Sequence, residues 1–261
     1  MRHVIIMAVL LLNASLLHAT PTEWVFVAES FPPFSLAQDE MADNTPPKPG
    51  ASPFAHIIYQ TCRALQRRCS IKIYPWRRAL PLAEQGQVAG IYPVLRNRQR
   101  EQAFFISPML IHTLYGFFTQ RGDPLNYRRA ADLAGYAIAV YGPSGTSAVL
   151  DTIMPQVPNA TIQLESTNLR VLKKLAAGRY GSPSAAVVNV DVAHHLITTA
   201  GIDSLREAGV LAPIDYAIGL SRISVDRPEA EAFNQAVAQL IRDGQANRWI
   251  EQAGLQPYTR R

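Results

Sequence analysis

One turn in the sequence favours the binding of an anion. Residues 142–147 read Gly-Pro-Ser-Gly-Thr-Ser and lead into a predicted helix, so Ser144, Gly145 and Thr146 stand at a helix N-terminus. The first N–H groups of a helix have no partner within it and lie at the positive end of its dipole, so they attract anions. The alternative is an ordinary helix cap, in which Ser144 or Thr146 accepts one of these N–H groups.

Arginine is the dominant basic residue. Of the 25 basic residues, lysine occurs only at Lys48, Lys72, Lys173 and Lys174. The planar guanidinium group suits carboxylates and phosphates. The net charge is +5, but the arginines are spread through the chain and no nucleic-acid motif accompanies them. We therefore do not expect nucleic acid as a partner.

Side chains for metal binding or acid–base catalysis are sparse. Cys62 and Cys69 have no further Cys or His nearby, and His194-His195 on a predicted helix lacks a third ligand. No Ser-His-Asp pattern or phosphate loop is evident. The only acid–base candidates near a cleft are Glu29, Glu165 and His112. The sequence predicts no metal, no cofactor and no catalytic residue, and we expect the chain not to be an enzyme.

The N-terminus predicts export. Arg2 and His3 precede an apolar run at residues 4–12, and Leu-His-Ala follows at 17–19, which is typical of a secretory signal cleaved after Ala19. A membrane anchor is the alternative, but about 20 apolar residues are needed to cross a bilayer and this run is shorter. No later stretch is long and apolar enough to do so. We expect a soluble protein outside the cytoplasm, in which Cys62 and Cys69 form a disulfide rather than two free thiols.

The rest of the chain alternates strands and helices. Strands are predicted at residues 24–28, 70–74, 88–95, 136–141, 185–190 and 214–221. Helices are predicted at 54–66, 79–85, from about 148, and at 169–177, 192–200 and 228–254, while residues 37–52 form a loop. The pattern predicts α/β lobes with largely parallel sheets. Residues 20–261 exceed one average domain, which favours two lobes.

Five stretches carry a resemblance to a known family. They are Phe-Pro-Pro-Phe-Ser at 31–35; Trp-Arg-Arg-Ala-Leu at 76–80 with Gln-Gly-Gln-Val at 85–88; Arg100 with Phe104, Phe105, Ser107 and Pro108; Asp-Leu-Ala-Gly at 132–135 with Ser-Gly-Thr at 144–146; and Tyr-Ala-Ile-Gly at 216–219 with the helix that ends near Trp249. In this order they resemble the bacterial extracellular solute-binding proteins of family 3, which include polar amino-acid-binding proteins of ABC importers.

The resemblance implies a two-lobed, periplasmic-binding-protein-like fold. Lobe one would hold residues 20–115 and 218–261, lobe two would hold 116–217, and a hinge would close the lobes over a ligand. The implied function is a monomeric periplasmic protein that captures a small polar or anionic molecule, an amino acid or an organic acid, for the permease of an ABC importer. The alternatives are a dehydratase-like periplasmic enzyme and a sensor that presents its ligand to a membrane receptor.

The resemblance also implies site residues. Arg100 takes the position whose guanidinium grips a ligand carboxylate with two hydrogen bonds, and a one-residue gap leaves Arg96 as a second candidate. Phe31 and Trp76 take the positions of aromatic walls, and the phenol of Tyr92 could point into the cleft. The alternative for the aromatic residues is packing in the core, and for the arginines a solvated surface position.

Two departures from the family pattern bear on the ligand. Amino-acid-binding members often carry a second-lobe aspartate for the ammonium group, and Ser184 stands at the aligned position. In the first lobe, Ala89 replaces the aspartate of a Gly-x-Val-Asp pattern. Burying an ammonium group without a carboxylate partner is costly, so we do not expect that the ligand must carry an ammonium group. Asp191 or Glu29 could substitute as that partner.

Overall fold

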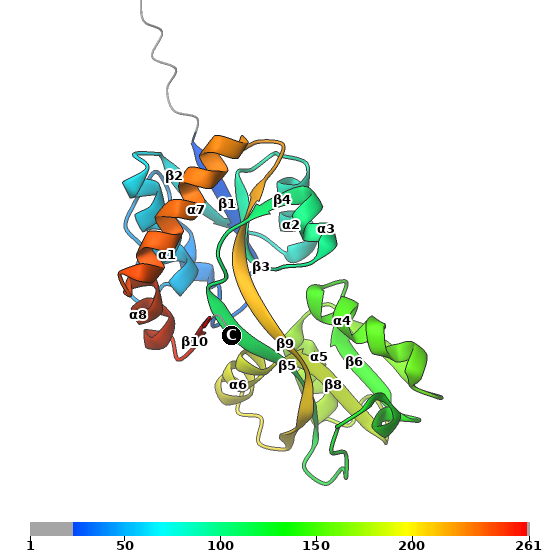
Figure 1. Cartoon of the computed structure of the whole chain (residues 1–261). Helices are drawn as coiled ribbons and strands as arrows, with labels where there is room; N and C mark the ends of the chain where they lie inside the picture. The colour runs from blue at the N-terminus through cyan, green and yellow to red at the C-terminus, as the bar shows by residue number, and fades with distance from the viewer. Residues whose placement is uncertain (1–22, 260–261) are drawn as a thin grey trace, which may run out of the picture.

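The computed structural model describes residues 23–259. The predicted signal segment at residues 1–19 lies outside the described residues. One continuous sheet runs through two lobes (Figure 1), and helices cover its faces. The α/β, two-lobed architecture expected from the sequence is confirmed. None of the helices in residues 23–259 is long and apolar enough to cross a membrane.

The first lobe is built on three parallel strands, β1 (Trp24–Ala28), β2 (Cys69–Ile73) and β3 (Gly90–Leu95). One face is covered by α1 (Pro53–Ala64), α7 (Arg227–Arg242) and α8 (Gln245–Gln252), and there Phe26 stacks on Phe233 with ring centroids 5.7 Å apart. The other face is covered by α2 (Trp76–Glu84), where Val27 packs in a separate core with Ala79. Because side chains alternate along a strand, the neighbours Phe26 and Val27 enter different cores.

The second lobe repeats this arrangement with β6 (Ala137–Tyr141), β7 (Thr161–Glu165) and β8 (Ser184–Asn189), again parallel. Its helices are α4 (Gly145–Ile153), α5 (Asn168–Ala176) and α6 (Val190–Thr199). Every residue of β8 is buried, whereas β7 is the outer strand and mostly not buried. The continuous apolar run of β8 is typical of a strand covered on both faces.

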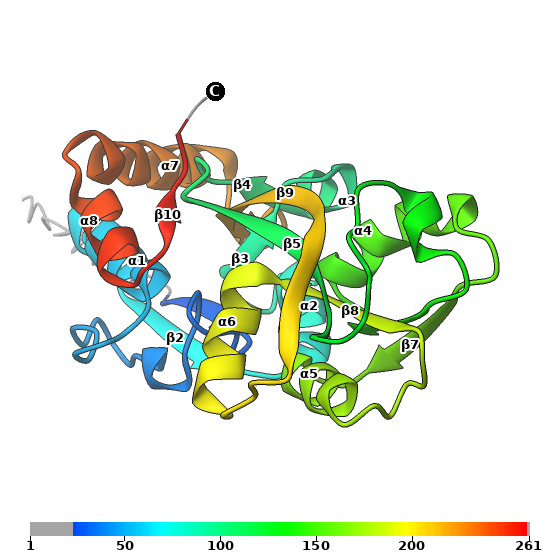
Figure 2. The same cartoon turned by 90° about the horizontal axis from the view of Figure 1, so that it is seen from below.

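Two long strands join the lobes, β5 (Ile111–Gln120) and β9 (Leu205–Ser221). They run antiparallel along all of β5, and Figure 2 shows them passing together between the lobes. β9 pairs with β3 in the first lobe, and β5 pairs with β8 in the second. The ladder is irregular between Tyr115 and Gly116. The lobe boundaries expected at residues 115 and 217 fall inside these strands, although Tyr216 already pairs with Leu95 of the first lobe.

The expectation of largely parallel sheets holds within each lobe only. The two strands that connect the lobes are antiparallel, because the chain leaves the first lobe along β5 and returns to it along β9. β4 (Phe104–Ile106) also pairs antiparallel with β9, and β10 (Gln256–Pro257) with β5. α3 (Arg98–Ala103) and three short 3-10 helices, Ala37–Asp39, Ala130–Leu133 and Met154–Gln156, complete the described chain.

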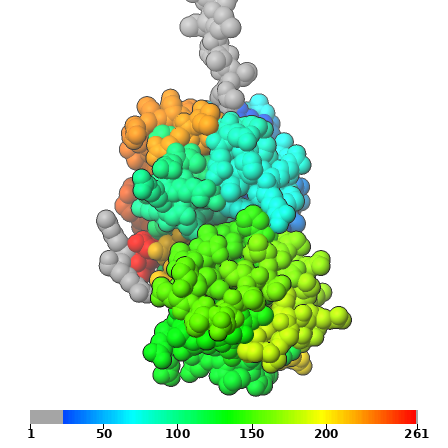
Figure 3. Space-filling model, turned by 90° about the vertical axis from the view of Figure 1, so that its right-hand side faces the viewer, coloured from blue at the N-terminus to red at the C-terminus, as the bar shows by residue number. Residues whose placement is uncertain are grey.

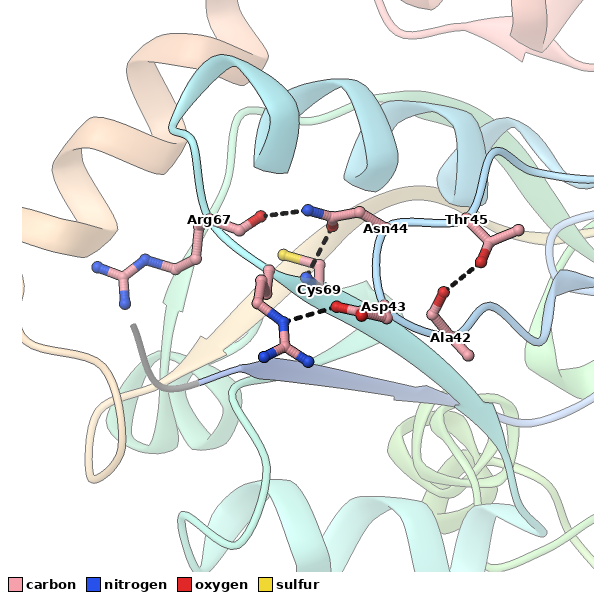
Figure 4. A network of polar contacts seen from close by, with 7 residues as sticks. Ala42, Asp43, Asn44, Thr45, Arg67 and Cys69 are labelled. Atoms are coloured by element: carbon pink, nitrogen blue, oxygen red, sulfur yellow. Dashed lines mark hydrogen bonds and ion pairs between the residues drawn. The ribbon is translucent and has the colours of Figure 1, made fainter. Parts of the chain in front are cut away.

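The disulfide expected from the sequence is present. Cys62 of α1 and Cys69 of β2 are bonded, with their Cα atoms 6.2 Å apart. The loop at residues 37–52 is fastened to the same place, as Figure 4 shows: the Asn44 side chain donates to the carbonyl oxygen of Arg67 at 2.9 Å and accepts the N–H of Cys69 at 2.8 Å. The bridge and the loop together fix the end of α1 to the start of β2.

Candidate functional site

A cavity of about 490 Å³ lies between the lobes. The first lobe contributes Glu29, Phe31, Trp76 and Arg100 among others, the second lobe contributes Tyr141 and the start of α4, and Tyr115 and Tyr216 of the two joining strands reach it from behind. In the space-filling view the lobes lie one above the other and their surfaces meet (Figure 3). A ligand in this cavity would contact both lobes.

Strand direction places these side chains. Glu29 follows β1, Leu95 ends β3 and Tyr141 ends β6, and all three line the cavity. In α/β folds, ligands bind beyond the carboxyl ends of parallel strands, where the chain turns into the next helix. Both lobes turn such ends toward each other, so the cavity receives loops and helix starts from both.

The start of α4 is one polar wall. The Oγ atom of Ser144 accepts the N–H of Ser147 at 3.2 Å, and the Oγ atom of Ser147 accepts the N–H of Ser144 at 2.9 Å. This reciprocal cap leaves the N–H groups of Gly145 and Thr146 without a protein acceptor in the described part of the chain. Both residues line the cavity, so the positive end of the helix faces it.

Arg100 of α3 forms part of the opposite wall. Its side chain is only 11% exposed, and its Nη1 atom donates to Glu84 Oε1 at 2.6 Å. Its Cζ atom lies 5.9 Å from the ring centroid of Trp76. Burial lowers the pKa of Arg100, and the neighbouring Glu84 carboxylate opposes that shift. The ion pair with Glu84 holds the guanidinium group in place and compensates part of its positive charge.

Glu29 connects the lobes. The hydroxyl of Tyr141 donates to its two carboxylate oxygens, at 2.9 and 3.1 Å. Burial raises the pKa of Glu29, and these hydrogen bonds oppose the shift. Arg77 makes a second link, because its Nη2 atom donates to the carbonyl oxygen of Gly142 at 3.0 Å. The lobes are therefore in direct polar contact across the cleft.

The back of the cavity is closely packed. The hydroxyls of Tyr115 and Tyr216 lie 3.1 Å apart, and burial raises the pKa of both. A Cβ atom at Gly145 would lie 2.7 Å from Leu95 Cδ2 and 3.2 Å from the Tyr115 hydroxyl oxygen. Glycine at this position therefore lets the second lobe approach the first.

Solved structures share this two-lobed architecture. A histidine kinase sensor domain with similarity to periplasmic binding proteins matches with a TM-score of 0.76 at 16% identity, over 91% of this chain and 99% of that one. The fold is that of the periplasmic binding proteins. A Streptococcus pneumoniae amino-acid ABC transporter substrate-binding protein bound to L-arginine gives 0.70 at 15% identity, over 88% and 94% of the two chains. An ancestral amino-acid-binding protein, a precursor of cyclohexadienyl dehydratase, gives 0.69 at 14%, over 88% and 94%. Neither protein-family models nor curated protein sequences match the chain.

Within this binding-protein fold, six of the residues expected at the site line the cavity: Arg100, Phe31, Trp76, Ser144, Gly145 and Thr146. Tyr92 and Arg96 do not. Tyr92 is fully buried, stacked on Phe54 at 5.5 Å, with its hydroxyl 3.4 Å from Asp39. Arg96 is exposed and 3.4 Å from Glu101. The side chain of Tyr92 enters the core, and the three residues that follow it in β3, Pro93, Val94 and Leu95, line the cavity instead.

The alignment of Ser184 with a ligand-binding aspartate is wrong. Ser184 begins β8 and pairs with Ala137 at the start of β6, at the opposite end of the strands from the cavity. The cavity end of β8 is Asn189, which accepts the N–H of Val192 at 3.1 Å and donates to the Thr113 hydroxyl at 2.9 Å. A neutral amide that is already engaged therefore stands there.

The other carboxylates and histidines considered for the cleft lie elsewhere, apart from Glu29. Asp191 accepts the hydroxyl of Thr113 at 2.5 Å. Glu165 ends β7 and forms ion pairs with Arg170, at 2.8 Å, and with Lys174. His112 lies 2.7 Å from Asp215 on the joining strands. Within residues 23–259, no group of three or more His, Cys, Asp or Glu side chains could hold a metal ion.

Sequence reasoning missed several cavity residues: Arg77, Tyr115, Tyr141, Asp151 and Tyr216. A signal existed for Tyr141, which ends a predicted strand directly before the Gly-Pro-Ser-Gly turn. Arg77 was visible only as the neighbour of Trp76. Tyr115 lies on β5, a strand that the sequence pattern did not reveal.

Proposed function

We propose that this chain is an exported solute-binding protein that holds a small molecule with an anionic group between its lobes and passes it to the permease of an ABC importer. One observation carries the proposal: anion-binding groups from different lobes line the same cavity. Arg100 comes from the first lobe, and the N–H groups of Gly145 and Thr146 come from the second.

The size and composition of the cavity agree with this role. Pockets for small ligands are commonly about 300–1,000 Å³, with aromatic walls and a few polar groups. A volume near 490 Å³ lined by Phe31, Trp76 and three tyrosines is in this range. An amino acid or an organic acid is the ligand class that we propose.

The same groups provide a reason for closure. A ligand shifts a conformational equilibrium only by its differential affinity for the two states. An anion held by Arg100 alone would bind the open form equally well. An anion that also meets the start of α4 gains those contacts only when the lobes are together.

A sensor that presents the ligand to a membrane receptor is the second candidate. It is favoured by the similarity to the histidine kinase sensor domain, which has the highest TM-score of the three structures described. Both roles need the same cavity and differ in the partner. Pull-down by a purified importer permease or by a receptor ectodomain, with and without ligand, would separate them.

Binding itself is tested by thermal unfolding with a panel of amino acids, organic acids and small inorganic anions. A ligand at 100 times its dissociation constant adds about 2.7 kcal/mol to the free energy of unfolding. Mass spectrometry of the recovered ligand should show it unchanged. No shift with any anionic compound would contradict the proposal, and conversion of the ligand into a product would establish an enzyme instead.

A further inference from the structure

The two outer strands of the sheet differ in what covers their free edges. At one end, the edge of β2 is covered, because Met41 and Ile71 exchange backbone hydrogen bonds at 3.1 and 2.8 Å. At the other end, β7 pairs with β6 only among residues 23–259, and Figure 2 shows it at the outer edge of the second lobe. An exposed edge strand presents unpaired N–H and C=O groups that can pair with another chain. β7 is therefore an open edge of the sheet.

The hydrogen bonds to β6 show which residues of β7 face outward. The N–H of Thr161 donates to the residue before β6 at 3.0 Å, and the carbonyl oxygen of Glu165 accepts from the residue after β6 at 3.1 Å. The backbone groups of successive residues in a strand point to opposite edges. Thr161, Gln163 and Glu165 therefore bond to β6. The backbone groups of Ile162 and Leu164 point away from the sheet.

The side chains of β7 do not protect this edge. The strand reads Thr-Ile-Gln-Leu-Glu and holds no lysine, arginine or proline, which edge strands commonly use to prevent pairing. Leu164 is 61% exposed. The one charged residue, Glu165, is only 8% exposed and forms ion pairs with Arg170 and Lys174. The outward side of β7 is therefore partly apolar and carries no unpaired charge of its own.

The strand is complementary to a second copy of itself. In an antiparallel pair centred on Gln163, Ile162 lies opposite the partner subunit's Leu164, and the two residues can exchange both backbone hydrogen bonds because both face outward. The two-fold axis repeats this pair on its other side. Thr161 lies opposite the partner subunit's Glu165, so no like charges face each other. Ile162 and Leu164 lie on the same face of the strand, so pairing also covers the exposed leucine.

We propose that β7 is a dimerisation edge, at which two copies of this chain join antiparallel about Gln163 and continue the sheet from one copy into the other. The contact is isologous, as a two-fold dimer requires. A single pair of short strands belongs to the small interfaces, below about 1,200 Å² in total, which are weak. The dimer therefore forms as the protein concentration rises. It replaces the expectation of a monomer.

Such a dimer leaves both cavities accessible. No residue of β7 lines the cavity. The cavity end of β7 is Glu165, because β6 runs parallel to β7 and ends at the cavity residue Tyr141. Antiparallel pairing places this end beside the partner subunit's Thr161, so the two cavities lie at opposite ends of the interface. Ligand binding and dimer formation can therefore be perturbed separately.

Two substitutions at one exposed position test the pairing. Gln163 bonds to β6, so it forms a non-hydrogen-bonded pair with its own copy, in which the Cα atoms are about 4.5 Å apart and within reach of a disulfide. Gln163→Cys places two thiols there, and Gln163→Lys places two like charges there. The native cysteines do not interfere, because they are bonded to each other. Gln252→Cys and Gln252→Lys, the same changes at an exposed position of α8, are the matched controls.

We expect sedimentation and light scattering to show wild type passing from monomer to dimer as its concentration rises. Gln163→Lys should weaken the dimer by about fivefold or more, and Gln252→Lys should leave it unchanged. Thermal unfolding of dilute Gln163→Lys should match that of wild type, because the position is exposed, so that loss of the dimer is not mistaken for unfolding. Under mild oxidation Gln163→Cys should form a disulfide-linked dimer, and Gln252→Cys should stay monomeric.

Three results would overturn the proposal. The first is a wild type that stays monomeric at every concentration, which would leave the edge of β7 to a strand of some other protein. The second is a dimer that Gln163→Lys weakens no more than Gln252→Lys does. The third is equal cross-linking of Gln163→Cys and Gln252→Cys, because contact by random collision does not depend on strand pairing.

Discussion

Replacement of Arg100 by alanine should weaken ligand binding far more than replacement of Arg96. The two arginines lie on either side of Asn97 at the start of α3, and the sequence alone left them as competing candidates. Arg100 lines the cavity with a side chain 11% exposed, whereas Arg96 is 53% exposed and does not line it. The pair is a matched test of the anion-binding wall.

The magnitude follows from burial. Truncating one partner of a buried, hydrogen-bonded charge pair costs about 2–5 kcal/mol of binding free energy. The Arg100 guanidinium is already paired with Glu84, so we expect a loss at the lower end of this range. At about 1.4 kcal/mol per tenfold, that is a roughly 30-fold weaker affinity. An exposed charge such as Arg96 contributes about 0–1 kcal/mol, which is less than about fivefold.

The assay is calorimetric titration of wild type and both variants with the ligand found by screening. Thermal unfolding without ligand is the control, because Arg100→Ala also leaves Glu84 without its partner and can lower stability. Equal losses of affinity in the two variants, or wild-type affinity in Arg100→Ala, would refute the placement of the anion at Arg100. The fold assignment would be unaffected.

Three further perturbations have expected outcomes. Mass spectrometry of unreduced protein should show a mass two hydrogens below that of the dithiol form, and two alkylatable thiols in the native protein would contradict the bridge. A Cys62→Ser/Cys69→Ser double variant should lose about 2.5 kcal/mol of unfolding free energy in denaturant titration, because the bridge no longer restricts this short loop in the unfolded chain. Gly145→Ala should weaken ligand binding, because its Cβ would lie 2.7 Å from Leu95 Cδ2 and keep the lobes from closing fully, whereas Gly122→Ala, with nothing within 4 Å, should leave binding unchanged. Tyr141→Phe removes a hydrogen bond between the lobes, so fluorescence energy transfer between labels on the two lobes should report a more open unliganded protein; an unchanged transfer efficiency would show that this bond does not hold the lobes together.

The sequence predicted the elements that bury a regular apolar pattern. The first strand was predicted at residues 24–28, where the structure has β1, because its residues are apolar and a Pro-Pro turn ends it. β5 was not predicted. Its burial does not alternate along Phe117 and Phe118, since it is covered on both faces where it joins the lobes. β9 begins at Leu205 and is longer than the strand predicted at 214–221, because its first part pairs with β5.

The candidate site was predictable where the residue types are typical of one local structure. Glycine and serine in the turn before α4 belong to a helix start, and the structure has Ser144 in that role, as the cap. Tyr92 shows the limit of such reasoning, because a side chain one position along β3 faces the core instead of the cavity. Arg100 and Arg96 could not be separated either, since burial depends on where α3 packs and not on the local sequence.

The inter-lobe contacts suggest how ligand capture and closure are connected. Glu29 is the point where a hydrogen bond from the second lobe, through Tyr141, meets a wall of the ligand space. Tyr141 also directly precedes the turn that begins α4, so a movement of the second lobe displaces both its contact with Glu29 and its anion-binding N–H groups. A ligand with an anionic group that lies between Arg100 and the start of α4 would contact both lobes. A molecule that reaches only one of these two walls would bind the open and closed forms about equally well, and closure is driven by the difference in affinity between them.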